Sequence, residues 1–474
     1  MRRAHASALV PALALAAGLF FATAAASAAP CSGRPTDPAG YQGYTYGAAL
    51  VKTYDGARAR VHYATTGTHA PDLTTTRADM VPDSVALSGE IAEKSLAKYA
   101  EMGFKAPPGD ASCTSNGGDD KLDIYLVTFA GADGTTVPEA CSGASCSSFV
   151  LVESTFVGRG YPTPADGFRT AIAHELFHAE QNAYDSQLDR FWAEGTAQWA
   201  MKTVYPDLTD FEGQLPAFFK ENTRSIDTPP AGVTSGFLYG AAVWPLFLTL
   251  RHGPDTVRLI LAKEADGTKS IAAVDAVLVT KGSSIADAYP LFGAWNAATK
   301  ALAGSGGYPD AAKYPGVKTA ALADGASGIT SGMPYLVYRG TLAALSKISL
   351  ETDAARNAGV VVPIEGGKPA LDKAAKLPAN AEGEVLVVVA GITTKKTDAP
   401  FTVRIGAPDP VSSPASSGGA SSGETPSTSS SGGCAVVASS APSGGARSLL
   451  LALGVVLAGL AVVRARAARS TRRS

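Results

Sequence analysis

The sequence predicts an α+β protein in which a large mixed domain precedes a small all-β sandwich domain. Helical periodicity and strand-like alternation are mixed up to about residue 305, whereas short β-rich runs separated by turn residues fill residues 310–407. Roughly 400 residues lie between the terminal segments, which is too many for one ordinary hydrophobic core. We therefore expect one domain over residues 29–305 and a second over residues 310–407.

Residues 1–28 have the pattern of a secretory signal peptide. Arg2 and Arg3 precede an apolar stretch, and Ala26-Ser27-Ala28 is an A-x-A cleavage pattern. An exported chain meets an oxidising compartment, so disulfides are expected. Apart from Cys434, four cysteines allow three pairings, and one of these joins Cys141 to Cys146 and Cys31 to Cys113. Residues 30–55 could be a short pro-segment, although no processing site marks them.

The first part of the mixed domain alternates between strand and helix patterns. A helix is expected over Pro82–Met102, and strands are expected over Leu122–Phe129 and Ser148–Thr155. The second of these strands could be an edge strand that aligns a peptide. An acidic cluster of Asp119, Asp120 and Asp123 could bind Ca²⁺, which prefers oxygen ligands. The cluster lacks the spacing of a recognised calcium loop, so a solvated turn is the alternative.

A further helix is predicted from Asp166, whose side chain can serve as an N-cap. Its apolar stripe consists of Phe168, Ile172, Leu176 and Phe177, and a solvated face is expected for Arg169, Glu180 and Gln181. The same helix contains the run His174-Glu175-Leu176-Phe177-His178. Residues four apart on a helix project from one face, so the two imidazoles can bind a single ion while Glu175 reaches the water beside it. The alternative is an ordinary packed helix.

This run is the H-E-x-x-H arrangement of zinc metallohydrolases, which use a third protein ligand. Gln181 and Tyr184 stand where a metzincin would have Gly and His, which excludes that class. Downstream, Asp189 is expected to cap a second helix that contains Trp192-Ala193-Glu194-Gly195-Thr196-Ala197. The alternative for Glu194 is an exposed carboxylate favoured by the helix dipole.

The Trp192–Ala197 segment resembles the W-x-E-G-x-A run of gluzincin aminopeptidases, and more loosely the E-x-x-A of thermolysin-like enzymes. The resemblance implies a zincin-like metalloprotease domain in which His174, His178 and Glu194 bind one Zn²⁺ and Glu175 is the general base. It departs from those families in its shorter gap to Glu194 and in having Gln198 where thermolysin-like enzymes have Asp.

A donor for the oxyanion is also expected, and Tyr239 is the main candidate. Leu238-Tyr239-Gly240-Ala241-Ala242 resembles the Y-G-A segment downstream of the gluzincin zinc site, which implies that the Tyr239 hydroxyl contacts the tetrahedral intermediate. Tyr184 and His252 are weaker candidates.

The C-terminal end predicts surface display. Residues 408–433 are a Pro/Ser/Gly-rich linker. In residues 434–474, Cys434 precedes a short apolar segment and an arginine-rich tail, which resembles the C-terminal sorting signals of myxobacterial type. The resemblance implies a processing enzyme that acts near Cys434, attachment to the membrane through this segment, and a place at the cell surface, in the outer envelope or outside the cell. A simple tail anchor is the alternative.

Charge argues against a nucleic-acid partner. Of the 40 basic residues, eight arginines lie in the two terminal segments, so 32 remain against 42 acidic residues. Nucleic-acid binding needs clustered Lys and Arg. The sequence therefore predicts a secreted or surface-displayed zinc metalloendopeptidase that acts on protein or peptide substrates. The alternatives are a non-catalytic adhesin with a structural or vestigial zinc site, and a zinc hydrolase that acts on cell-wall amides.

Overall fold

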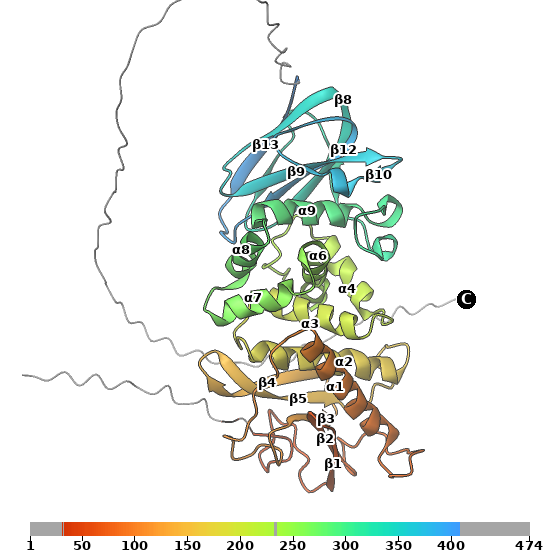
Figure 1. Ribbon diagram of the computed structural model, residues 1–474. Coiled ribbons are helices and arrows are strands. Elements are labelled where there is room, and N and C mark those ends of the chain that lie inside the picture. The colour runs from red at the N-terminus through yellow and green to blue at the C-terminus, as the bar shows by residue number, and fades with distance from the viewer. Residues whose placement is uncertain (1–30, 32, 232–234, 408–474) are drawn as a thin grey trace, which may run out of the picture. The chain divides into compact units, whose positions relative to one another are not determined.

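The computed structural model describes residue 31 and residues 33–231 and 235–407 (Figure 1). The predicted signal peptide at 1–28, the linker at 408–433 and the sorting segment at 434–474 lie outside the described residues. The chain has mixed α+β structure, and its contacts divide it into two compact units. The first unit comprises the residues up to Phe211 together with Leu248–Val277, and the second comprises Glu212–Phe247 and the residues from Leu278 onward. Within the described residues, no helix has the length and apolarity needed to cross a membrane.

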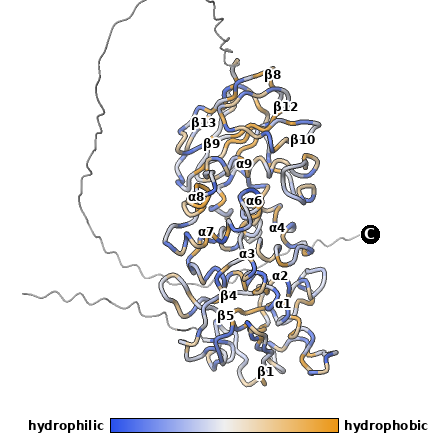
Figure 2. Tube along the Cα trace, viewed as in Figure 1, coloured by the Kyte–Doolittle hydropathy of each residue, from blue (hydrophilic) through white to orange (hydrophobic). Residues whose placement is uncertain are grey.

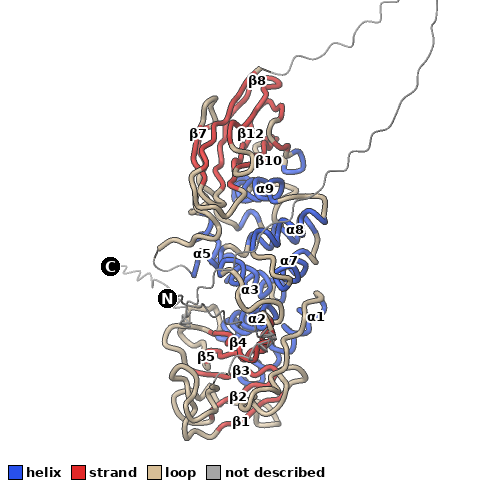
Figure 3. The backbone as a smooth tube through the Cα atoms, turned by 90° about the vertical axis from the view of Figure 1, so that its left-hand side faces the viewer, coloured by secondary structure: helices blue, strands red, loops and turns tan. Residues whose placement is uncertain are grey.

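A five-stranded sheet forms one layer of the first unit. Its strands are β1 (Val51–Asp55), β2 (Ala59–Ala64), β3 (Leu122–Val127), β4 (Gly134–Ser142) and β5 (Ser145–Glu153). Their order across the sheet is β1-β2-β3-β5-β4, as Figure 3 shows. The three central strands are parallel, and the two outer strands pair antiparallel with their neighbours.

The predicted edge strand at Ser148–Thr155 is wrong in one respect. It corresponds to β5, which is interior because it pairs with β3 on one side and β4 on the other. Nearly every residue of β5 is buried, as expected for a strand covered on both faces. The edge strand on this side of the sheet is β4, which the sequence analysis did not predict. A Pro138 and a register shift beyond it are features typical of an edge.

Helices cover one face of this sheet. They include α1 (Asp83–Glu101) and α2 (Pro164–Asn182), and α3 (Arg190–Val204) packs against α2. The prediction for α1 is confirmed to within a residue at each end. The predicted N-cap of α2 is wrong, because Thr163 caps the helix by accepting a hydrogen bond from the backbone N–H of Asp166 at 3.1 Å. Asp166 instead lies in the first turn, where a carboxylate favours the helix dipole.

The solvated face expected for α2 is only partly present. Arg169 is partly exposed, but Glu180 and Gln181 are each 2% exposed. Because α1 packs beside α2 and α3 packs on it, both of those faces are covered. A sequence pattern for one helix does not show how many neighbours will enclose it.

The N-terminal segment covers the opposite face of the sheet. Tyr44 and Tyr46 pack on an apolar cluster that includes Tyr125 and Phe149, and side chains alternate between faces along a strand. The fully buried guanidinium of Arg34 forms ion pairs with three carboxylates, those of Asp110, Asp123 and Glu139.

Two disulfides join Cys31 to Cys113 and Cys141 to Cys146, as the sequence allowed. The first bond anchors the chain three residues before Arg34. Residues 33–55 therefore contribute buried side chains such as Arg34 and Tyr46 to the first unit, which argues against their being a removable pro-segment.

Six further helices follow α3 along the described chain. They are α4 (Asp210–Phe219), α5 (Ser235–Gly240), α6 (Val243–His252), α7 (Thr256–Ala265), α8 (Ser270–Thr280) and α9 (Ile285–Ala297). Short 3₁₀ turns occur at η1 (Lys300–Leu302), η2 (Ala311–Lys313) and η3 (Leu371–Lys373). The strands of the second unit are β6 (Thr319–Ala321), β7 (Ser327–Thr330), β8 (Tyr335–Thr352), β9 (Asn357–Glu365), β10 (Lys368–Pro369), β11 (Ala375–Lys376), β12 (Ala379–Gly391) and β13 (Ala399–Gly406).

These strands belong to one eight-stranded sheet, not to the two separate sheets of the predicted sandwich. Not all of the β-rich runs are short, since β8 has 18 residues and pairs with β12 along most of its length. The apolar residues concentrate on central strands such as β9 and β12 (Figure 2). Val385, Val387 and Val389 face one core cluster, and helix α9 closes the other face, where Gly293 lies against Val388. Helix α9 therefore packs on this face of the sheet, where the predicted sandwich would have a second sheet.

Candidate metal centre

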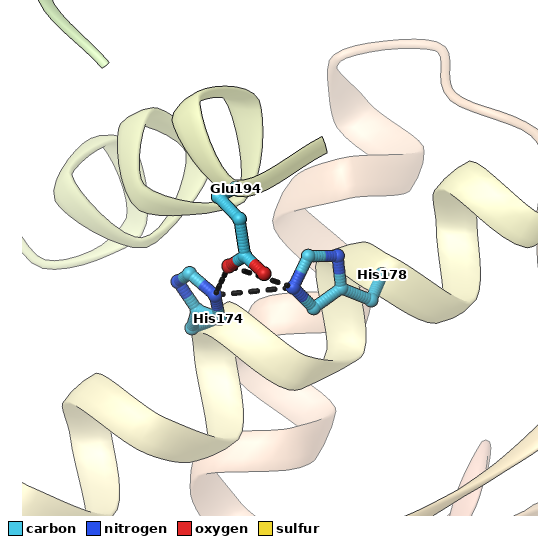
Figure 4. A group of neighbouring side chains, drawn as sticks. All are labelled: His174, His178 and Glu194. Carbon is cyan, nitrogen blue, oxygen red and sulfur yellow. Dashed lines mark hydrogen bonds and ion pairs between the residues drawn. The ribbon is translucent and has the colours of Figure 1, made fainter. Parts of the chain in front are cut away.

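Helix α2 brings two imidazoles to one point. His174 and His178 lie one turn apart, and their Nε2 atoms are 3.1 Å from each other (Figure 4). Helix α3 supplies the third group, since the Glu194 Oε2 atom lies 3.2 Å from Nε2 of His174 and 3.6 Å from Nε2 of His178. The ligand atoms of the three residues all lie within 4.8 Å of one another. The structure therefore brings together the three residues predicted to bind metal.

A glutamine holds the outer side of the His178 ring. The Gln181 Oε1 atom lies 2.7 Å from Nδ1 of His178, while its amide nitrogen donates to the carbonyl oxygen of Ala193 at 2.8 Å. A carbonyl oxygen only accepts hydrogen bonds, so this contact fixes which end of the amide faces the imidazole. Nδ1 of His178 must therefore carry the proton and donate it to Gln181.

A second glutamine holds His174 in the same way. The Gln198 Oε1 atom lies 3.2 Å from Nδ1 of His174, and the Gln198 amide nitrogen donates to the Asp210 carboxylate at 2.7 Å. The carboxylate accepts, so the amide oxygen faces the ring and Nδ1 is again the donor. Asp210 therefore orients the Gln198 amide, which in turn orients the His174 ring.

The donor set fits a divalent cation. Because Nδ1 is protonated on both rings, both Nε2 atoms are acceptors. They lie 3.1 Å from each other and 3.2 and 3.6 Å from the Glu194 carboxylate. Three acceptors so close together repel unless a proton or a cation lies among them. Two imidazole nitrogens and one carboxylate oxygen form a ligand set of catalytic zinc sites, which leave the fourth position for water. Such outer hydrogen bonds orient ligands around a metal.

The pKa values of His178 and Glu194 also indicate that this site attracts positive charge, either a proton or a metal cation. Burial alone would lower the pKa of His178, but the hydrogen bond and charge of Glu194 raise it to about 9. Burial alone would raise the pKa of Glu194, but its bonds to His174 and His178 hold that pKa well below the usual range. The site therefore keeps a carboxylate and attracts positive charge at neutral pH.

Glu175 lies beside this group and is held by strand β4. Its side chain is 8% exposed, and burial raises the pKa of its carboxyl. The Thr136 hydroxyl lies 2.9 Å from Oε2 of Glu175 and 2.7 Å from its backbone oxygen. Gly134 allows this approach, because a Cβ atom there would lie 2.7 Å from Cγ of Glu175. The strand therefore fixes the position of the carboxylate.

Tyr239 belongs to the other unit. It lies on α5 and is 7% exposed, and its predicted role as an oxyanion donor stays a prediction. Of the weaker candidates, Tyr184 uses its hydroxyl to accept a hydrogen bond from the backbone N–H of Lys105 at 2.9 Å.

The acidic cluster considered for calcium has diverging side chains. Asp119 pairs with Arg60 at 2.8 Å, and Asp120 accepts from the backbone N–H of Ala111 at 2.8 Å. Asp123 is buried with Arg34 and with His62, whose Nε2 lies 2.7 Å away. Because each carboxylate has its own partner, this arrangement favours the alternative of a structural turn.

Sequence reasoning missed Thr136, Gly134 and the role of Gln181. Residues 134–137 read Gly-Thr-Thr-Val, and the β-branched residues after a glycine are a strand signal that was available. Gln181 was assigned to a solvated face because its neighbour α3 is not visible in the pattern of α2.

Comparisons with known proteins add no family assignment. No family model matches the sequence, and no curated protein matches it. Among solved structures, the Salmonella Typhimurium protein PliG, a periplasmic inhibitor of g-type lysozyme, aligns with 19% of this chain and 98% of its own at 13% identity, with a TM-score of 0.16. A likeness at this level carries no inference about fold or function.

Proposed function

We propose that this protein is a zinc-dependent metalloendopeptidase with a zincin-like first unit. The observation that carries the proposal is the convergence of His174, His178 and Glu194, with both imidazoles anchored through Nδ1 and with Glu175 alongside. A structural zinc normally has four Cys or His ligands and needs no neighbouring general base. The three-ligand set beside a buried carboxylate therefore favours a hydrolase.

The three ligands would hold Zn²⁺, which when bound supplies Lewis-acid activation of water and of a substrate carbonyl. Glu175 would accept a proton from the attacking water at one of its carboxylate oxygens and later deliver that proton to the leaving amine. Its raised pKa suits both transfers, because a general base works best when its pKa approaches the working pH. The Thr136 hydroxyl keeps the carboxylate oriented between the two steps.

The edge strand supports action within a peptide chain. β4 ends the strand order, so among the described residues no strand pairs with its outer side. An extended peptide can add to such an edge by main-chain hydrogen bonds. Because Thr136 of β4 contacts Glu175, a peptide on this edge would pass the general base. We therefore favour cleavage at internal bonds over removal of terminal residues.

The same proposal includes export and surface display. The signal-peptide pattern at 1–28 and the sorting pattern at 434–474 carry it, with a processing enzyme acting near Cys434 and membrane attachment through the C-terminal segment. The two disulfides in the first unit support it, because disulfides persist in oxidising compartments.

The test is digestion of peptides blocked at both ends, followed by mass spectrometry of the products. The purified chain should cut internal bonds, and Glu175→Gln should lose about a hundredfold or more of the rate, the usual contribution of general acid–base catalysis. Glu101→Gln is the matched control, since Glu101 lies on α1 with a side chain that is 70% exposed. Equal cleavage by Glu175→Gln, or cleavage only of peptides with free N-termini, would contradict the proposal.

A further inference from the structure

A cavity lies in the first unit, on the side of α2 that faces away from the metal ligands. It has a volume of about 200 Å³, and its walls come from α1, from the segment after α1, from the start of β3 and from α2. The α2 residue in this wall is Glu180. Glu180 follows His178 by two positions, which places it about 200° around the helix from that ligand. The cavity and the metal centre therefore use opposite faces of one helix.

The cavity has an apolar interior and an exposed rim. Leu96, Phe104 and Leu122 form its inner walls, and all three are buried. Ala100 and Pro108 belong to the rim, and both are exposed to solvent. A small molecule can therefore enter from the surface and bury an apolar body. A cavity of roughly 150 Å³ with apolar walls is large enough for benzene, so this one has room for a ring and a short substituent.

Arg58 and Asp120 also line the cavity but are exposed, so the polar group of its interior is Glu180. It is 2% exposed, and its Oε2 atom has no hydrogen-bond partner among the described residues. Neighbouring hydroxyls are used elsewhere: Tyr99 donates to the carbonyl oxygen of Ala173 at 2.6 Å, and Tyr184 accepts from the backbone N–H of Lys105. A buried polar atom without a partner costs free energy of folding, so proteins rarely keep one without a use.

A hydrogen-bond donor can satisfy the Oε2 atom of Glu180, because a carboxyl oxygen accepts hydrogen bonds. A carboxyl group that has lost its hydration is best compensated by a cation that also donates hydrogen bonds. A primary ammonium group has three donors and no acceptor, and it is small enough for a narrow cavity. An apolar ring or alkyl chain attached to it would lie against Leu96, Phe104 and Leu122.

We propose that this cavity is a binding site for a small aryl or alkyl primary amine, whose ammonium group bonds to the Glu180 carboxyl. The site is independent of peptidase action, because its residues do not include the metal ligands or Glu175. A bound amine would contact α2 on the face opposite His178.

Benzylamine is the probe, and calorimetric titration of the full-length chain is the measurement. The protein is kept free of zinc, so that coordination of the amine to metal cannot contribute. Saturable binding of one benzylamine per chain is expected. Toluene, which has the ring but no donor, should bind about tenfold to a hundredfold more weakly, the equivalent of one charged hydrogen bond.

Glu180→Gln should weaken benzylamine binding by the same factor, and the control Glu101→Gln should leave it unchanged. Glu180→Gln is expected to fold, because the replaced carboxyl atom Oε2 makes no hydrogen bond within the described residues. Thermal unfolding checks this. Ala100→Trp provides a second variant, since a large side chain on the rim should block entry while Glu180 stays intact.

The following results would overturn the proposal. They are the absence of saturable benzylamine binding to the folded wild-type chain, equal affinity in Glu180→Gln, and equal affinity in Ala100→Trp. Toluene binding as tightly as benzylamine would also overturn it, because the carboxyl would then have no part in recognition.

Discussion

Replacing Gln181 by methionine tests whether the metal site depends on the hydrogen bond to the outer side of His178. Methionine has nearly the same length and volume as glutamine, so the packing between α2 and α3 is preserved. The substitution removes the acceptor 2.7 Å from Nδ1 of His178 and the donors to Ala193 and Thr196. The imidazole then loses the contact that fixes its proton on Nδ1.

The expected magnitude follows from these contacts. Removing the outer partner of a histidine ligand lowers metal affinity by about tenfold to a hundredfold, which is roughly 1.4–2.7 kcal/mol. Losing the hydrogen bonds from the Gln181 amide to Ala193 and Thr196 also lowers the free energy of unfolding, by about 0.5–1.5 kcal/mol per bond. Gln181 is 2% exposed, so water cannot replace the lost bonds without a rearrangement.

The assay is competition for zinc between the protein and a coloured chelator at neutral pH. Gln187→Met is the matched control, because Gln187 is exposed in the turn after α2. We expect normal zinc affinity in Gln187→Met and weakened zinc affinity in Gln181→Met. Unchanged zinc affinity in a folded Gln181→Met protein would refute the reasoning about the imidazole proton.

Three further predictions concern the core, strand β4 and pH. Arg34→Met should lower the free energy of unfolding in urea by about 3–5 kcal/mol, because it leaves buried carboxylates unpaired; a loss below about 1 kcal/mol would show that the N-terminal segment is dispensable. Gly134→Ala should reduce kcat/KM for peptide hydrolysis by about a hundredfold with zinc affinity unchanged, since the new Cβ displaces Glu175, whereas Gly213→Ala, where no atom lies within 4 Å, should be neutral. Equal hydrolysis in both variants would contradict that role for β4. The metal-free protein should lose about 3 kcal/mol of its free energy of unfolding between pH 6.5 and pH 9. The pKa of His178 is raised from 6.5 to about 9 in the folded chain, so protonation of His178 stabilises the fold fully below pH 6.5, and this stabilisation is lost as the pH rises through about 9. The zinc-loaded protein should lack this component in parallel urea titrations, and identical pH profiles for the two forms would count against it.

The site could be predicted from the sequence where its parts are close along the chain. His174 and His178 are one helical turn apart, so helix geometry alone places them together. The W-x-E-G-x-A resemblance then indicated Glu194, and the structure brings its carboxylate to the two imidazoles. The helix at Pro82–Met102 was also predictable, because its apolar stripe is long and continuous.

The parts that escaped prediction depend on contacts between distant segments. Thr136 reaches Glu175 from a strand 39 residues earlier, and Arg34 reaches Glu139 across 105 residues. No local pattern reports such pairings. Gln181 and Glu180 were expected in solvent because the pattern of α2 shows only one apolar stripe, whereas packing encloses the helix more fully. In the second unit, the β-rich runs could be recognised in the sequence. Their pairing into one sheet could not be predicted, because it joins strands that are distant along the chain.

The most direct test of the central claim is the zinc content of the purified chain, measured together with peptide hydrolysis in wild type and Glu175→Gln. The account predicts one zinc per chain in both proteins and hydrolysis only in wild type. This result would mean that His174, His178 and Glu194 bind a catalytic ion and that Glu175 acts on water beside it. A wild-type chain without zinc, or zinc-loaded Glu175→Gln that still hydrolyses peptides at the wild-type rate, would contradict the account.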